Sequence, residues 1–346
     1  MRAKMTSLRF AAPLDENMIE EMMRSKIPDG TKRKERWAIT LFRDWLTKRN
    51  TEGVLQEAQL HVFKEVDELT AGELDYLFSF FILEIRTYNG DRFKSSTLKN
   101  ITSMLQYHYN KHLNKGWSIF KDKDFQRSRN NLDLSMKLSR ESGVDGNSKR
   151  AEVIEETHDQ ILWDKKLLGS DTPTKLVHTL VYLFGKNFAL RGRDEHRRLQ
   201  MSMIEEQYDD LEQRYFLLYT ENISKTSKGG IHDIKKEPKK TRAYENQSSP
   251  DKCIVQLYRE YLTHRPPGLE DFYLTPLINP KSDTWYKITP MGVNQLGNVV
   301  KNLFKNAEIK GRFTNHSLKR TARSQLCADG FGRDIMIKKT RAYFGK

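Results

Sequence analysis

The sequence is poor in cysteine, since Cys253 and Cys327 are the only two in 346 residues. Because no Cys or His spacing resembles a zinc site, we expect neither a disulfide framework nor a bound metal. Long apolar runs are missing too: no stretch approaches the roughly 18 apolar residues of a membrane span. The amino-terminal segment MRAKMTSLRF lacks the continuous apolar core of a secretion signal. These absences predict a protein of a reducing compartment that is neither secreted nor inserted into a membrane.

Acidic residues are also in short supply relative to basic ones. The chain has 60 Lys and Arg against 46 Asp and Glu, which leaves a formal net charge of +14 at pH 7. A surplus of this size indicates a polyanionic partner, more often nucleic acid than an acidic membrane face. Apolar residues make up only 37% of the chain, yet aromatic residues at 10% argue against wholesale disorder. The length leaves room for two folded domains.

Hydrophobic periodicity divides the chain into four parts. Residues 1–29 have weak periodicity and are predicted to form a flexible arm. Residues 30–138 carry apolar side chains at helical steps of three and four residues, which predicts a compact helical domain. Residues 139–152 have the Gly, Ser, Asp and Asn content of a linker. Residues 153–346 then form a second domain.

The second domain mixes helical and strand patterns. Asp171 or Thr172 can cap a helix that has Pro173 at its first position and ends near Gly185. The aromatic run 214–221 is β-prone, and turn residues followed by a second β-prone run come after it. Further helices are predicted at 251–264, at 289–307 with Thr289 as cap and Pro290 at the first position, and at 316–328. The expected fold class is therefore mainly α (α+β), with a small antiparallel sheet in the second half.

The positive charge is concentrated in two segments of the second domain. From Lys310 to Lys346 there are ten Lys and Arg against two acids, a net of +8. From Glu221 to Arg242 there are seven Lys and Arg against three acids. Each segment alone is typical of a solvated surface, but the two together favour a groove that binds a phosphate backbone. Such binding falls steeply as the salt concentration rises.

Three short strings carry residues suited to phosphate chemistry. They are FALRGRDEHRRL with Arg191, SKTSKGG with Lys225 and Lys228, and TNHSLKRTARSQL. In the last, His316 and Lys319 lie three apart near a helix start and are expected to share a face. Chemistry at a phosphodiester needs donors on the non-bridging oxygens and an acid near the leaving oxygen. The alternative, purely structural interpretations are an ion pair for Arg191, a surface role for Lys225 and a capping or packing role for His316.

In this order, and together with ELDYLFSFFILEIRTYNG and STLKNITSMLQ in the first half, the strings resemble the tyrosine recombinases. Within that superfamily the chain is most similar to crypton-type transposon recombinases and to host genes derived from them. The resemblance spans most of the chain. It implies a helical, SAM-like core-binding domain followed by a mostly helical catalytic-type domain, which together enclose duplex DNA.

The resemblance also implies roles for individual residues. Arg191 matches the first catalytic Arg that holds the scissile phosphate, and Arg193 is the second candidate for that position. Lys225 matches the hairpin Lys that protonates the leaving 5′ oxygen, with Lys228 as runner-up. His316 matches the start of the family's His-x-x-Arg motif, where it would assist proton transfer and phosphate binding.

The sequence departs from the family pattern at two places. Lys319 stands where the second catalytic Arg belongs, and lysine lacks the planar two-pronged donor that grips two phosphate oxygens. Arg320 is adjacent but is turned about 100° away on a helix. The family's nucleophile position falls beyond Lys346, so the domain is expected to be truncated at its C-terminal end. Tyr343, the only tyrosine after His316, lies nearer to the family's His or Trp position.

The sequence therefore predicts a crypton-derived protein that binds double-stranded DNA and no longer cuts it. Arg193, Lys228, Arg320 and Arg323 are the predicted DNA contacts. Two alternatives stay open: an active recombinase with a 3′-phosphotyrosyl intermediate, and a nuclear scaffold for protein interaction that keeps only the fold.

No cofactor, metal or membrane partner is expected, whereas a homo-oligomer on DNA is. The basic clusters Lys32–Arg36 and Lys235–Arg242 are typical of nuclear addresses, so the expected compartment is the nucleus.

Overall fold

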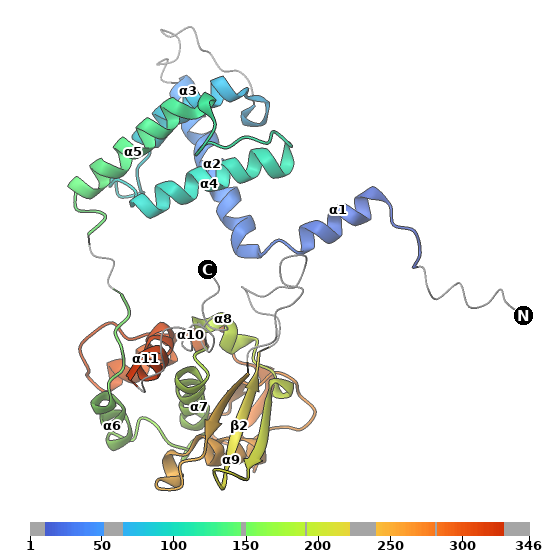
Figure 1. Cartoon of the computed structure of the whole chain (residues 1–346), viewed down its shortest axis with the longest axis vertical. Coiled ribbons are helices and arrows are strands. Elements are labelled where there is room, and N and C mark those ends of the chain that lie inside the picture. The colour runs from blue at the N-terminus through green and yellow to red at the C-terminus, as the bar shows by residue number, and fades with distance from the viewer. Residues whose placement is uncertain are drawn as a thin grey trace, which may run out of the picture. The chain divides into compact units, whose positions relative to one another are not determined.

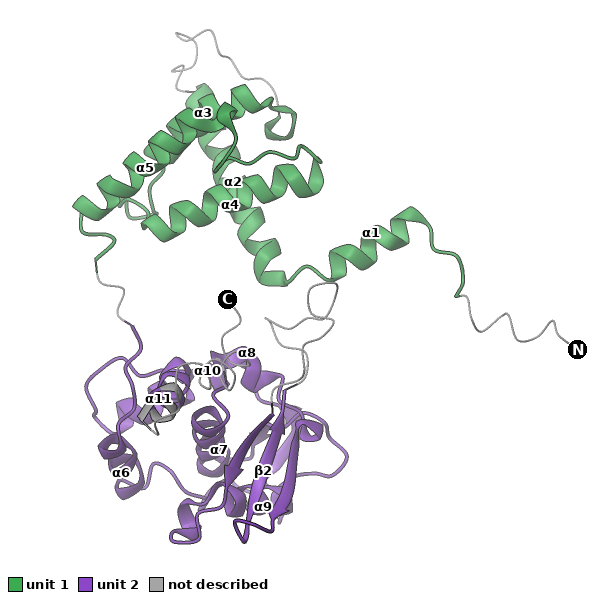
Figure 2. Ribbon diagram, viewed as in Figure 1, with its two compact units in different colours: residues 1–148 green, residues 149–346 purple. Residues whose placement is uncertain are grey.

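The chain divides into two compact units, Met1–Ser148 and Lys149–Lys346 (Figure 2). The structure, a computed structural model, describes residues 11–51, 65–146, 150–190, 192–221, 240–280 and 282–328, without the side chains of residues 323 and 325–328. The division falls inside the segment expected to be the linker. None of the helices in these ranges is both long and apolar enough to cross a membrane.

Unit 1 is helical throughout its described residues (Figure 1). Its elements are α1 (Glu16–Ser25), α2 (Asp29–Thr51), the 3-10 turn η1 (Val66–Glu68), α3 (Ala71–Glu84), α4 (Ser95–His112), the 3-10 turn η2 (Lys123–Phe125) and α5 (Gln126–Glu141). Helix α3 packs on α5, and α2 packs on α4. The rings of Phe42, Phe78 and Phe81 are fully buried among them. Helix α1, by contrast, buries none of its side chains.

Local sequence explains where several of these helices begin and end. Helix α3 starts at a capping box in which the Thr70 hydroxyl accepts from the Glu73 N–H and the Glu73 carboxylate accepts from the Thr70 N–H. Helix α5 extends to Glu141, three residues past the predicted end at Leu138, and Ser139 is buried with its hydroxyl donating to the Ser135 carbonyl. The first residues of the expected linker are therefore helical.

Unit 2 combines helices with two small antiparallel sheets, which confirms the predicted mainly α fold class. Its helices are α6 (Glu156–Asp164), α7 (Pro173–Asn187), α8 (Gly192–Arg197), α9 (Ile254–His264), α10 (Val293–Asn306) and α11 (Asn315–Ala328), with 3-10 turns η3 (Met201–Met203) and η4 (Pro250–Lys252). Its strands are β1 (Ile204–Asp209), β2 (Arg214–Thr220), β3 (Lys240–Tyr244), β4 (Leu274–Pro276) and β5 (Tyr286–Pro290). The sheet orders are β1-β2-β3 and β4-β5.

Helix α7 forms the centre of unit 2, since ten of its fifteen residues are buried. The Thr172 hydroxyl accepts from the Lys175 N–H, and Pro173 is the first helical residue, as the sequence predicted. The helix continues to Asn187, two residues past the predicted end at Gly185. A glycine within an otherwise apolar helix therefore marks a close contact here, and not a helix end.

The prediction for residues 289–307 was wrong at its start. Thr289 and Pro290 belong to strand β5, and α10 begins at Val293 after Gly292. Pro290 lies opposite Leu274 of β4, so pairing with a distant strand overrides a local pattern typical of a helix start. Strands β1 and β3, the described neighbours of β2, were not predicted. The predicted second strand after residue 224 lies outside the described residues.

Candidate nucleic-acid interface

Helix α11, which carries the His-x-x-basic string, is fixed to the rest of unit 2 by buried hydrogen bonds. The Asn315 side-chain amide donates to the Leu296 carbonyl of α10 at 3.1 Å. The Thr321 hydroxyl accepts from the Ile154 N–H at 2.7 Å and donates to the Ser317 carbonyl at 2.9 Å. These bonds set which face of α11 is buried and which is exposed.

Helix α11 also packs against α7 at a point where α7 has no side chain. A Cβ atom added to Gly185 would lie 2.4 Å from Cδ1 of Leu318, which is fully buried. Ala189 and Ala322 form a second small contact between this segment and α11. The small residues of the α7 segment therefore let α11 approach closely.

The packing of α11 separates the two residues that the sequence placed on one face. His316 is exposed, and its backbone N–H donates to the Thr314 hydroxyl at 3.2 Å. Lys319 is only 8% exposed. Although residues three apart are neighbours on a helix, α11 meets the protein body between them. Of the two side chains only His316 is exposed, and a joint role of His316 and Lys319 at a phosphate stays a prediction.

Arg320 is exposed but already has a partner. Its guanidinium donates to the backbone carbonyl of Ala151, near the start of unit 2. The Arg320 side chain therefore does not point the same way as Lys319. This agrees with the prediction that adjacent residues of a helix are turned about 100° from each other. Arg323 lies on α11, but its side chain is outside the described residues.

Arg193 is an exposed cation that bridges two helices. It lies on α8 and donates to the Asn294 side-chain oxygen of α10 at 3.1 Å. A Cβ atom added to Gly297 would come within 3.1 Å of the Arg193 side chain, so the aliphatic part of Arg193 lies along α10. Arg191, Lys225, Lys228 and Tyr343 lie outside the described residues, and their roles stay predictions.

Helices α8, α10 and α11 form one contiguous group. Both α8 and α11 pack on α10, and α8 also touches α11 (Figure 1). The structure thus brings Arg193 and His316 onto neighbouring helices. Helix α10 between them contains no acidic residue and exposes Lys301 and Lys305. This surface, defined by α8, α10 and α11, can contact an anionic backbone.

Behind this surface lies a buried histidine that the sequence analysis did not single out. His196 is completely buried, and its Nδ1 lies 3.1 Å from the Tyr273 hydroxyl. Burial lowers the pKa of His196 to about 3, so the ring is neutral near pH 7. Because His196 sits in the charged string RDEHRR, no local signal indicated that it would be buried.

A second group of arginines, Arg214 and Arg242 on the three-stranded sheet and Arg259 on α9, contacts the sheet, but its charge is compensated. Arg259 is held by both carboxylate oxygens of Glu206, with its Nη2 2.6 Å from Oε1. Arg242 and Arg214 pair with Asp209 and Glu212 at 3.4 and 2.8 Å. The guanidinium groups also lie over aromatic rings of the sheet. These arginines hold the sheet together and offer little free charge to a ligand.

Comparisons with known proteins identify relatives of both units. Residues 153–305 match a family described as a domain of unknown function, DUF3504. Zinc finger MYM-type protein 2 of Homo sapiens is 26% identical over 288 residues, which cover 76% of this chain and 20% of that protein. Transcriptional regulator QRICH1 of Homo sapiens is 28% identical over 165 residues, covering 44% of this chain and 21% of that protein. The chain thus spans about a fifth of the length of the curated relatives it matches.

Solved structures that the chain is similar to include recombinases. The XerA recombinase aligns with 93% of this chain and 86% of its own at 13% identity, with a TM-score of 0.34. The XerH site-specific recombinase bound to its difH substrate aligns with 91% of this chain and 93% of its own at 10% identity, with a TM-score of 0.38.

Proposed function

We propose that this chain, in which residues 153–305 match the DUF3504 family, is a recombinase-derived protein that binds double-stranded DNA in the nucleus without cutting it. The net charge of +14 supports a nucleic-acid partner. The relatives support a nuclear role, since one is named a transcriptional regulator and two are named zinc finger proteins.

The observation that carries the proposal is that the basic residues on α8 and α11 differ in exposure and in hydrogen bonding. Arg193 and His316 are exposed on helices that both pack on α10. Lys319 is buried and Arg320 is bonded to a backbone carbonyl. The first pair can contact phosphates, whereas the second pair cannot supply the two-pronged grip that strand cleavage needs without rearrangement. This difference supports binding without cleavage.

The experiment for DNA binding measures the affinity of the full chain for duplex DNA at several salt concentrations. If the helical surface contacts phosphates, log K falls linearly with log salt concentration. Arg193→Gln should weaken binding to unrelated duplexes by a similar factor and make the slope shallower by about 1, because one phosphate contact is lost.

Arg214→Gln is the matched control. Arg214 is also a partly exposed arginine of unit 2, but it pairs with Glu212 at the β1–β2 turn, at the other end of β2 from Thr220. This variant should bind DNA like the wild type. Binding that is independent of salt, or equal losses in Arg193→Gln and Arg214→Gln, would contradict the proposal.

Loss of cleavage is tested separately with a nicked suicide substrate, which traps a 3′-phosphotyrosyl adduct if one forms. We expect no covalent adduct with the full chain. A trapped adduct that disappears in Tyr343→Phe would support the active recombinase instead, and Tyr343 would then be its nucleophile.

A second candidate function, assembly with another copy of this chain, is favoured by α1. Five apolar side chains, four of α1 and one just before it, are 44% to 55% exposed: Leu14, Met18, Ile19, Met22 and Met23. The apolar face of one α1 can cover that of a second copy, since such side chains gain by removal from water. Sedimentation of the full chain without DNA should then show a dimer that Met18→Glu dissociates. A monomer at all concentrations excludes this candidate.

A further inference from the structure

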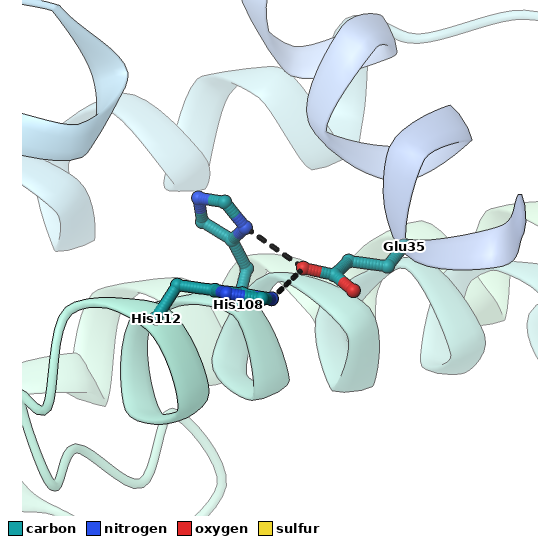
Figure 3. A group of neighbouring side chains, drawn as sticks. All are labelled: Glu35, His108 and His112. Carbon is teal, nitrogen blue, oxygen red and sulfur yellow. Dashed lines mark hydrogen bonds and ion pairs between the residues drawn. The ribbon is translucent and has the colours of Figure 1, made fainter. Parts of the chain in front are cut away.

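Unit 1 contains a group of three potential metal ligands that has no part in the proposed DNA surface. Glu35 lies on α2, and His108 and His112 lie on α4 (Figure 3). One ligand atom from each residue falls within a span of 4.8 Å. Among the residues that the structure describes, this group has the composition and spacing to hold a metal ion.

The fold of unit 1 creates this arrangement. His108 and His112 are one helical turn apart, so their rings lie on the same face of α4. Helix α2 packs against α4 and brings one Glu35 carboxylate oxygen against both rings. The Glu35 Oε1 atom lies 3.0 Å from His108 Nδ1 and 2.8 Å from His112 Nε2.

These distances are close to those around a tetrahedral ion. Zinc binds imidazole nitrogen and carboxylate oxygen at about 2.0–2.2 Å, which places neighbouring ligand atoms roughly 3.3–3.5 Å apart. The Glu35 oxygen therefore needs to move away from each nitrogen by only about half an ångström to admit the ion, and the two ring nitrogens lie within 4.8 Å of each other. Two imidazoles and one carboxylate are also the ligand types of known three-ligand zinc sites.

A second contact of His108 supports a role as metal ligand. The other ring nitrogen of His108, Nε2, lies 3.2 Å from Oδ1 of Asp67. Arg43 in turn donates to both Asp67 oxygens at 3.1 and 3.3 Å. A carboxylate behind a ligating histidine fixes the ring orientation and makes the ligating nitrogen more basic. His108 thus already has the outer support that metal-binding histidines have.

The exposure of the three side chains leaves room for a fourth metal ligand from solvent. The Glu35 and His108 side chains are 12% and 14% exposed, whereas His112 is 38% exposed. An ion held by these atoms is enclosed on the protein side and open to water beside His112. We propose that Glu35, His108 and His112 bind one first-row transition-metal ion, with zinc the best match, and that a water molecule completes its tetrahedral coordination.

The bound ion links α2 to α4 through residues 73 positions apart in sequence. Binding that occurs only in the folded state stabilises unit 1 by mass action. The ion is thus a structural clamp of the helical unit, and its presence does not depend on the DNA-binding proposal.

The test uses the full chain, prepared without a histidine tag and freed of metal with a chelator. Addition of Co²⁺ should produce the visible absorption of tetrahedral cobalt with one ion per chain, and Zn²⁺ should displace it. Mg²⁺ should not bind, because it prefers six oxygen ligands. Zn²⁺ should also raise the melting temperature of the metal-free protein.

Three variants locate the site. His112→Gln should bind Co²⁺ at least tenfold more weakly, and because His112 is partly exposed the variant should keep the helical circular dichroism of the wild type. Asp67→Asn, which changes the support of His108 but no ligand, should weaken binding about 10- to 100-fold. Lys111→Gln, an exposed neighbour on the last turn of α4, is the control and should bind like the wild type.

Two outcomes overturn the proposal. If Co²⁺ gives no tetrahedral absorption and Zn²⁺ leaves the melting temperature unchanged, the cluster is only a hydrogen-bonded group of two histidines and a glutamate. If His112→Gln binds Co²⁺ as tightly as Lys111→Gln does, the ion sits on another of the nine histidines of the chain.

Discussion

Acidification should destabilise unit 2 through His196. The imidazole is fully buried, and burial lowers its pKa from 6.5 to about 3. In the unfolded chain the same ring takes up a proton near pH 6.5. Below that pH the unfolded state therefore binds a proton that the folded state does not, and stability falls as the pH falls.

The magnitude follows from the difference between the two pKa values. Each pH unit below 6.5 removes about 1.4 kcal/mol of unfolding free energy, so His196 alone accounts for roughly 2 kcal/mol between pH 7 and pH 5. The loss continues down to about pH 3, where the folded ring also becomes protonated. Above pH 6.5 the contribution of His196 is constant.

The assay is urea unfolding of the full chain at pH 7 and pH 5, followed by circular dichroism, for the wild type and for His196→Asn. Asparagine keeps a polar partner for the Tyr273 hydroxyl but cannot titrate. The transition that this substitution shifts at pH 7 identifies the unfolding of unit 2. His178, whose pKa burial also lowers, is present in both proteins and its effect cancels.

The variant should be less stable at pH 7 but should lose about 2 kcal/mol less than the wild type on going to pH 5. If both proteins lose the same free energy between the two pH values, His196 is not held neutral by burial, and the reasoning is refuted.

Three further substitutions test contacts inside unit 1 or inside unit 2, each by urea unfolding. Gly185→Ala should destabilise by about 1 kcal/mol, because overpacking against Leu318 outweighs the gain in helix propensity; a more stable variant, or no rescue by Leu318→Ala, would argue against the close contact. Asp159→Asn should cost about 2 kcal/mol, since Asp159 is the anionic partner of Lys186, whose side chain is largely buried. An unchanged midpoint would mean that the pair contributes nothing. Thr70→Ala should cost about 1 kcal/mol through loss of the α3 cap, and Thr70→Ser should restore most of it.

Parts of the fold could be predicted because their signals are local. The Thr172 cap, Pro173 and the apolar stripe behind them specify α7 without reference to the rest of the chain. The aromatic run of β2 is a strand signal for the same reason. Other elements depend on pairing. The charged strand β1 is stable because it pairs along its whole length with β2, and Pro290 is extended because β4 lies beside it.

For the candidate DNA surface, too, some features follow from local sequence and others depend on tertiary packing. Sequence spacing alone indicated His316 and Lys319 as neighbours, which is true of any helix. Which of them meets solvent depends on how α11 packs, and the bonds of Asn315 and Thr321 bury Lys319 and expose His316. The sequence prediction of no metal site is not tested, but no local pattern could have placed Glu35 beside His108, because the two residues lie far apart in the chain.

By itself, the sequence determined the helical character of the chain, its positive charge and its resemblance to recombinases, since composition, periodicity and motifs are properties of neighbouring residues. Only the tertiary structure decided which cations remain exposed, which histidine is buried, and that Glu35 lies against His108 and His112. The physical reason is that burial and coordination depend on contacts between helices and strands far apart in the chain, which no short window of sequence contains.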